Sequence, residues 1–113
     1  MNTEAEFHEL VDDTLTRLEA AVEDAADAAE IDVDCDEAGG VLTLSFENGS
    51  SIILSRQSAT RQLWLAARSG GYHFTYDDAG SRWSCTRSGM SFEELVGQAL
   101  VEQAGLRLGD FAA

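Results

Sequence analysis

Residues 41–56, VLTLSFENGSSIILSR, predict two antiparallel strands joined by a tight turn. In the first half, Leu42, Leu44 and Phe46 alternate with other residues, which places their side chains on one face of a strand. Asn48-Gly49 predicts a two-residue type I′ turn, because both central positions of that turn need a positive φ. A hairpin of this kind indicates that the chain folds around an antiparallel sheet.

The alternating pattern continues on both sides of this hairpin. In IDVDCD, residues 31–36, the aspartates share one strand face, and Ile31, Val33 and Cys35 share the other. In chain order, strands are expected at 31–36, 42–46, 51–56, 61–67, 72–76 and 82–86, with turns also at Gly39-Gly40, Gly70-Gly71 and Asp78-Ala79-Gly80. Short, regularly spaced strands with short turns predict an antiparallel meander.

Helices are predicted at the two ends of the chain. Apolar residues recur every three or four positions from Phe7 to Ala29, which predicts one long amphipathic helix. On this helix, an arc on the far side from the apolar residues holds His8, Asp12, Glu19, Glu23 and Glu30. The second helix opens with a capping box, in which Ser91 is the N-cap and Glu94 is the third helical residue.

Two amphipathic helices and one half-buried sheet pack most simply as two layers. We therefore expect an α+β two-layer sandwich, with both helices on one face of a five- or six-stranded, largely antiparallel sheet. Its 113 residues suit one domain, 1–113. The apolar runs are too short to cross a bilayer, and the acidic start is unlike a secretory signal, so we expect a cytoplasmic protein that does not bind membranes.

Negative charge is concentrated at the start of the chain. Residues 1–37 hold 14 of the 21 acidic residues and one base, Arg17, whereas residues 38–113 hold seven acids and six arginines. Such a local field suits cations or a basic protein partner, and it excludes nucleic acid as a partner.

On the predicted first helix, seven pairs of acids lie three or four residues apart, and only Asp13–Arg17 offers an opposite charge at helical spacing. Each like-charge pair costs about 0.2–0.5 kcal/mol, so the face destabilises the helix. The alternatives are an ordinary solvated face and a surface that binds cations or a partner, and the segregation of charge favours the second. If the first strand lies beside this helix, Asp32, Asp34 and Asp36 extend the acidic surface. Exposed carboxylates suit hard, labile cations held weakly.

Trp64 is predicted to lie on the solvent face of the sheet. In RQLWLAA, residues 61–67, alternation directs Leu63 and Leu65 to the core and Gln62 and Trp64 to solvent. An exposed tryptophan beside an amide is typical of an interface anchor, the alternative being a ring half covered by its neighbours. By the same reasoning, Trp83 and Cys85 point to the core, and His73 points outward with no evident partner.

No catalytic constellation is apparent, because the serine, histidine and acidic residues lie in no motif that would organise them, and there is no phosphate-binding loop. We therefore expect a protein that is not an enzyme. Cys35 and Cys85 have no metal-ligand spacing, and they are expected to be free thiols.

A set of segments is distinctive when taken together with the acidic first helix and strand: Phe46-Glu47-Asn48-Gly49-Ser50, Arg56-Gln57, Gln62-Leu63-Trp64-Leu65-Ala66, Gly70-Gly71-Tyr72-His73-Phe74 and Arg87-Ser88-Gly89. This set resembles the frataxin family, and within it the bacterial, CyaY-type members. The resemblance covers nearly the whole chain. Ala25–Ala29 departs from it, being richer in alanine than the family's usual acid-dense helix end.

The resemblance implies an accessory protein that regulates iron–sulfur cluster assembly and binds Fe²⁺ and Fe³⁺ weakly, with other divalent cations also possible. It implies docking on the cysteine desulfurase and the iron–sulfur scaffold protein by a monomer, with iron-dependent oligomerisation left open. The implied metal positions are Glu19, Glu23, Asp24, Asp27, Asp32 and Asp34, with His8 as a further candidate, and the implied partner-binding positions are Arg56, Gln62 and Trp64 on the sheet face, with Glu19 and Glu23.

Two other functions stay open at this point. One is a metal-independent acidic adaptor that docks on the desulfurase, with iron incidental. The other is a ferroxidase, which would need a defined oxidation site among the exposed carboxylates.

Overall fold

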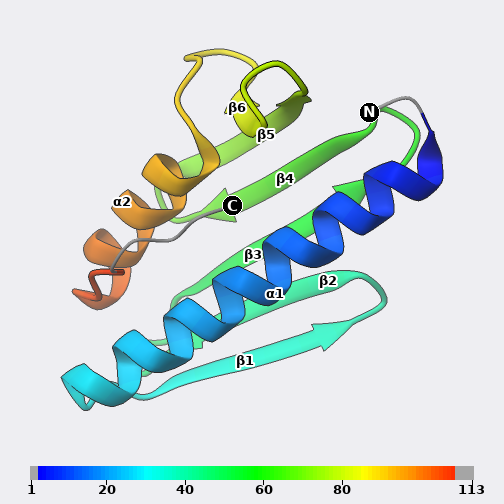
Figure 1. The fold of residues 1–113 in the computed structure, drawn as a ribbon. Coiled ribbons are helices and arrows are strands. Elements are labelled where there is room, and N and C mark those ends of the chain that lie inside the picture. Colours follow the sequence, from blue (N-terminus) through cyan, green and yellow to red (C-terminus); the bar gives the residue numbers. More distant parts are fainter. Residues whose placement is uncertain (1–2, 109–113) are drawn as a thin grey trace.

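A computed structural model describes residues 3–108 as two helices and six strands (Figure 1). The elements in chain order are α1 (Glu4–Ala29), β1 (Val33–Ala38), β2 (Val41–Phe46), β3 (Ser51–Gln57), β4 (Gln62–Ala67), β5 (Gly70–Asp77), β6 (Arg82–Cys85) and α2 (Phe92–Ala104). The strands form one antiparallel meander in the order β1-β2-β3-β4-β5-β6, so β1 and β6 are the edge strands.

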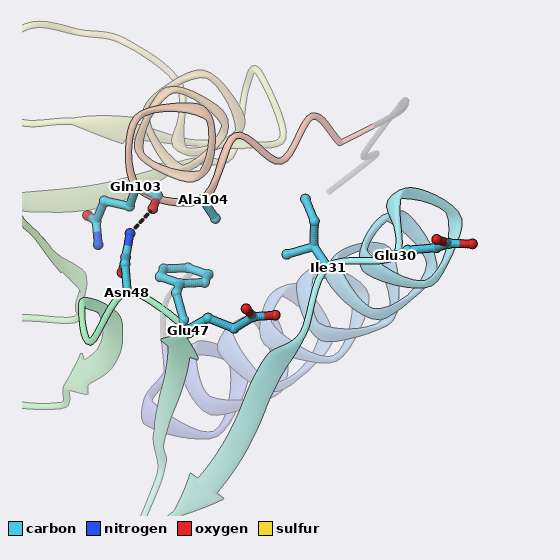
Figure 2. A pocket seen from close by; sticks show the side chains of 7 residues that line it. Glu30, Ile31, Glu47, Asn48, Gln103 and Ala104 are labelled. Carbon is cyan, nitrogen blue, oxygen red and sulfur yellow. Dashed lines mark hydrogen bonds between the residues drawn. The ribbon is translucent and has the colours of Figure 1, made fainter.

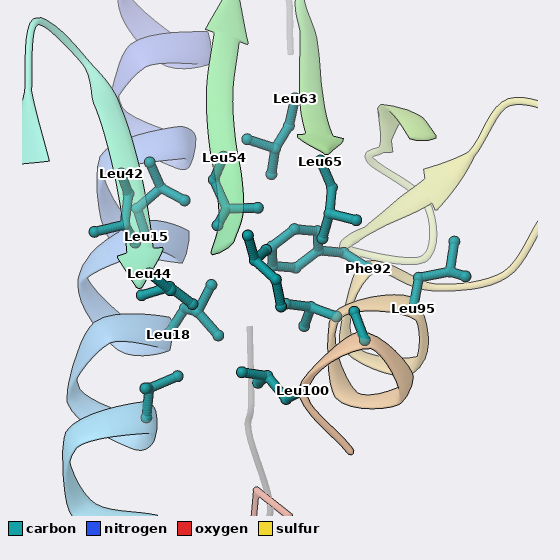
Figure 3. Close-up of a cluster of buried hydrophobic side chains, with 14 of the residues drawn as sticks. Leu15, Leu18, Leu42, Leu44, Leu54, Leu63, Leu65, Phe92, Leu95 and Leu100 are labelled. Atoms are coloured by element: carbon teal, nitrogen blue, oxygen red, sulfur yellow. The ribbon is translucent and has the colours of Figure 1, made fainter. Parts of the chain in front are cut away.

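Both helices pack on the same face of this sheet, as Figure 1 shows, which confirms the predicted fold class and settles the strand number at six. Figure 3 shows the core between the layers, where Leu15 and Leu18 of α1 meet strand leucines such as Leu54 and, from α2, Phe92. All of these side chains are at most 1% exposed. At about 25 cal/mol per Å² of apolar surface removed from water, this layer is the main source of stability.

The β1–β2 hairpin has the predicted turn at Gly39-Gly40, whereas the β2–β3 hairpin differs from the predicted one. Gly39 and Gly40 are the two loop residues between β1 and β2, and both have a positive φ, as a type I′ turn requires. Between β2 and β3, only Gly49 of the Asn48-Gly49 pair has a positive φ. Phe46 N–H donates to Ser50 O at 3.0 Å, which makes a three-residue loop with Gly49 in the bulge position. The type I′ prediction for Asn48-Gly49 is therefore wrong, although the hairpin itself is confirmed.

Gly70-Gly71 is also not a turn, because these residues are the first two of β5 and Ala67 pairs with Gly70. Arg61 belongs to the preceding turn, with φ at +52°, so β4 begins one residue later than predicted.

Both helices begin with the side-chain caps that stabilise free backbone N–H groups. Thr3 accepts a hydrogen bond from Glu6 N–H, and Ser91 accepts one from Glu94 N–H at 3.2 Å, which confirms the predicted cap of α2. The buried stripe of α1 also includes Thr14, whose Oγ1 donates to Leu10 O and accepts from Trp83 Nε1 at 3.0 Å. Trp83 is thus fully buried, as predicted, with its polar atom satisfied.

Candidate functional site

The acidic surface is formed by α1 and the edge strand β1, which lies beside it (Figure 1). Val33 and Cys35 pair with Phe46 and Leu44, which are core residues, so the odd positions of β1 face α1. Asp34 pairs with Ser45 and therefore faces the open side of the sheet. The acids of α1 and β1 consequently form a band that wraps around the sheet edge.

Glu19 lies at the centre of this band. Partial burial raises the pKa of its carboxyl group, and the charges of Glu23 and Glu37 and a hydrogen bond with Glu23 raise it further. These acids therefore repel one another in the folded protein. Two of them come from one helix and the third comes from β1.

Glu37 was not among the predicted site residues. The signal for it was present in the sequence, since Glu37 has the same parity as Val33 and Cys35 and so faces α1. Only the pairing of β1 with β2 shows that the strand extends to Ala38 and places Glu37 near Glu19.

Cys35 is a half-buried free thiol within the same band. Burial, followed by the charges of Glu19, Glu23 and Asp34, raises its pKa to about 11. The thiol is therefore neutral at physiological pH. All three charges act on the pKa of Cys35, so Glu19, Glu23 and Asp34 share one electrostatic environment. These are three of the predicted metal positions.

The other predicted metal positions are more peripheral. Asp24 and Asp27 are exposed on α1, and the backbone N–H of Asp32 donates to Glu47 Oε1 at 3.2 Å. Within residues 3–108, no three histidine, cysteine or acidic side chains converge closely enough to hold a metal ion.

The predicted placement of the α1 polar arc away from the sheet is wrong at His8 and Asp12. Arg56 Nη1 donates to His8 Nδ1 at 3.1 Å, and Arg56 Nη2 donates to Asp12 Oδ1 at 2.6 Å. Ser58 Oγ also lies 3.5 Å from His8 Nε2. These contacts hold His8 and Asp12 against the sheet. His8 binds Arg56 of β3 and does not lie with Glu19.

Arg56 also lies on a different face from the one that was predicted. Its partner across β3–β4 is the buried Leu63, so Arg56 is on the helix side of the sheet, where its Nε donates to Gly40 O at 3.4 Å. Its side chain is only 15% exposed. The prediction that Arg56 shares a surface with Gln62 and Trp64 is therefore wrong, because residue parity alone decides the face.

Trp64 and Gln62 lie on the open face, as strand alternation predicts. Trp64 Nε1 donates to Gln62 Oε1 at 2.9 Å. The Trp64 ring stacks on His73, with the ring centroids 4.1 Å apart and the planes 8° from parallel. His73 therefore has a partner that the sequence did not reveal, since the two residues meet only through the β4–β5 register.

A pocket of about 430 Å³ lies apart from these residues, between the C-terminal ends of the two helices (Figure 2). Phe46 and Ile31 contribute apolar walls, and Asn48 Nδ2 donates to Gln103 O at 2.7 Å at one side. Gln103 is 3% exposed and also bonds Arg68 N–H and Ser51 O, so its role here is to tie α2 to the loops.

The fold and this edge define a small α+β sandwich that carries a carboxylate band on its first helix and edge strand. The family model described as a frataxin-like domain matches residues 1–106, and the chain belongs to that family.

Named relatives agree with this assignment. The chain is 55% identical over 106 residues to the iron–sulfur cluster assembly protein CyaY of Azotobacter vinelandii, covering 94% of this chain and 93% of the relative. It is 48% identical to the protein of the same name from Pseudomonas fluorescens, with the same coverage.

Two solved structures share the fold. Frataxin from Psychromonas ingrahamii is 32% identical, with a TM-score of 0.84 and coverage of 98% of this chain and 99% of that one. Trimeric yeast frataxin complexed with ferrous iron has a TM-score of 0.71 at 23% identity, covering 82% and 83% of the two chains. No helix among residues 3–108 is both long and apolar enough to span a membrane.

Proposed function

We propose that this protein is a cytoplasmic, non-enzymatic accessory protein of iron–sulfur cluster assembly that binds iron weakly and docks on the assembly machinery. Family membership supports this, as do the relatives named iron–sulfur cluster assembly protein CyaY. A more distant member of the same fold was solved with ferrous iron.

The proposal depends most on the electrostatic repulsion that Glu23 of α1 and Glu37 of β1 exert on Glu19, which raises the pKa of Glu19. A bound cation relieves this repulsion, so Fe²⁺ binding to the band lowers the free energy of the folded protein. The band is open to water, and its carboxylates keep most of their hydration. Binding is therefore weak, and Mg²⁺ and Ca²⁺ compete with iron because all three are held by oxygen ligands.

Two surfaces serve partners in this proposal. The acidic band faces a basic surface of the cysteine desulfurase, where opposite charge accelerates and orients association. The Trp64–His73 stack with Gln62 offers the scaffold protein an aromatic anchor, the type of residue enriched at interface centres. The free protein is a monomer in this scheme.

Anaerobic calorimetric titration with Fe²⁺ tests the proposal. The Glu19→Gln/Glu23→Gln variant is expected to lose at least threefold in iron affinity and to bind the desulfurase more weakly. The matched control is Glu93→Gln/Glu102→Gln, which removes the same charge from α2, outside the band.

A control that lowers iron affinity as much as the band variant would show that net charge alone attracts iron, and the site would be wrong. Unchanged iron affinity with weakened desulfurase binding would instead favour the metal-independent adaptor.

A further inference from the structure

The open face of the sheet has an uncharged centre. Within β2, β3 and β4, every open-face position holds an uncharged residue, as at Thr43, Ile53, Ser55 and Ala66. Charged open-face side chains of the six strands lie in the outer part of the sheet, at Asp34 and Asp36 of β1 and where Asp77 of β5 lies opposite Arg82 of β6. In a chain of formal net charge -14, an uncharged partner surface can cover this centre without leaving buried ions unpaired.

His73 is the open-face residue of these strands that changes its charge near neutral pH. Its ring is exposed and stacks on the half-buried Trp64, with the ring centroids 4.1 Å apart. The pair is held in place by two hydrogen bonds. Thr86 N–H donates to His73 O at 2.9 Å, and Trp64 Nε1 donates to Gln62 Oε1 at 2.9 Å. A partner that covers Trp64 therefore also covers the imidazole.

The surroundings of His73 supply no negative charge beside the ring. Its uncharged open-face neighbours come from β4, β5 and β6, and they are Gln62, Trp64, Ala66, Gly71, Thr75 and Ser84. The segment after β6 contributes a cation, Arg87, which lines a cavity of about 250 Å³ together with His73. The first acid along β5 on this face is Asp77, and Thr75 lies between it and His73. An imidazolium at this position therefore depends on water for its solvation.

We propose that docking on the open face requires neutral His73, so that protonation of His73 weakens the hold on the partner. This inference rests on the proposed function, in which the scaffold protein contacts the Trp64–His73 stack. An uncharged partner surface removes the water that solvates an imidazolium, and it brings no acid in return. Attraction between the Trp64 ring and the cation replaces only part of that solvation.

The sign of the pH dependence follows from this exclusion of the proton. The complex forms with neutral His73, so affinity is highest above the pH range in which histidine titrates, and it falls as the pH drops through that range. By the same linkage, binding at a pH within that range releases protons from the wild-type protein.

The test titrates the purified iron–sulfur scaffold protein onto the full chain by calorimetry at about pH 8 and at about pH 5.5, the two ends of the range in which histidine changes charge. The His73→Phe variant keeps an aromatic ring but cannot take a proton. Between the two pH values, the wild-type dissociation constant should rise at least fivefold more than that of His73→Phe. Comparing these two changes cancels the titration of groups on the scaffold protein.

The matched control is His8→Gln, because His8 is the second of the chain's two histidines and is bonded to Arg56 on the helix side of the sheet. This variant should keep the wild-type pH dependence. A second readout repeats the titration at about pH 6 in buffers of different ionisation heat, where the wild type should release more protons on binding than His73→Phe does.

Equal pH dependence of the wild type and His73→Phe would overturn the inference. Tighter wild-type binding at the lower pH would also overturn it, because it would mean that the partner brings an acid to the imidazolium. Scaffold binding at about pH 8 that Trp64→Arg does not weaken would show instead that the partner docks elsewhere. That result would remove the proposed use of this face, and this inference with it.

Discussion

At the scale of single residues, the fold gives chemically similar side chains different surroundings. Glu19 is an acid whose charged form is disfavoured by partial burial and by two neighbouring acids. Trp64 and Trp83 show the contrast for aromatic rings, since one stacks on the open face and the other is completely buried.

We expect Glu19→Gln to stabilise the protein at pH 7. A raised pKa means that the folded state prefers protonated Glu19. The contribution of Glu19 to the free energy of unfolding is therefore lost as the pH rises through that pKa. Removing the charge relieves two repulsive pairs, worth about 0.4–1 kcal/mol together. Urea denaturation at pH 7 and at pH 4 measures this, with the gain shrinking at the lower pH. Glu102→Gln is the control, because Glu102 has no acid three or four residues away, and an equal gain there would contradict a local cause.

We expect Trp64→Arg to weaken scaffold binding and to leave the fold largely intact. The change removes a stacked aromatic pair worth about 0.5–1.5 kcal/mol, but it opens no cavity in the core. Trp83→Ala is the comparison, with an expected cost of about 3–5 kcal/mol from loss of a buried ring. Denaturant melts measure both costs. Similar costs for the two variants would mean that Trp64 is part of the core.

At the scale of elements, Arg56 fastens the N-terminal half of α1 to the sheet. Its guanidinium donates to Asp12 and His8 of α1, and its Nε donates to Gly40 O in the β1–β2 turn. Three elements therefore meet at one side chain. In an otherwise acidic stretch, this arginine supplies the opposite charge that the helix sequence lacks at that point.

We expect Arg56→Gln to destabilise the protein by about 1–2 kcal/mol, because hydrogen bonds to charged groups are lost while Asp12 keeps access to water. Arg17→Gln is the matched control, since Arg17 pairs with Asp13 within the exposed helix surface at 3.1 Å. That change should cost about 0–0.5 kcal/mol.

A double-mutant cycle between Arg56 and Asp12, measured by urea denaturation, checks the link directly. Additive effects of the two substitutions would rule out a stabilising link between Arg56 and Asp12.

At the scale of the whole molecule, the formal net charge is -14, and most of it lies along α1 and β1. Repulsion along this band opposes folding at low ionic strength. Screening by salt or binding of cations therefore stabilises the free protein, even without a partner.

We expect the melting temperature to rise by a few degrees between low salt and about 0.2 M NaCl, because screening weakens the repulsion within the band. Millimolar Mg²⁺ or Ca²⁺ should have a comparable effect through weak binding to the folded state. The Glu19→Gln/Glu23→Gln variant should respond less. Thermal melts measure this. A melting temperature that does not change with salt or with divalent cations would exclude destabilising repulsion within the band.

Local pattern determined the elements of this protein. Alternation assigned Trp64 to the open face and Trp83 to the core, and helical spacing assigned Leu15 and Leu18 to the buried stripe, because side-chain direction follows directly from backbone period. The cap at Ser91 is equally local, since its partner Glu94 is three residues away.

Only the tertiary structure decided which residues meet across the chain. Glu37 joins Glu19, Arg56 reaches Asp12, and His73 stacks on Trp64, because strand register and helix docking bring together positions far apart in sequence. The turn at Asn48-Gly49 belongs to the same class, since its two residues permit more than one loop and the pairing of Ser45 with Ser51 selects the longer one. Sequence spacing predicts the face to which each side chain points. It does not predict which distant residue packs beside that side chain.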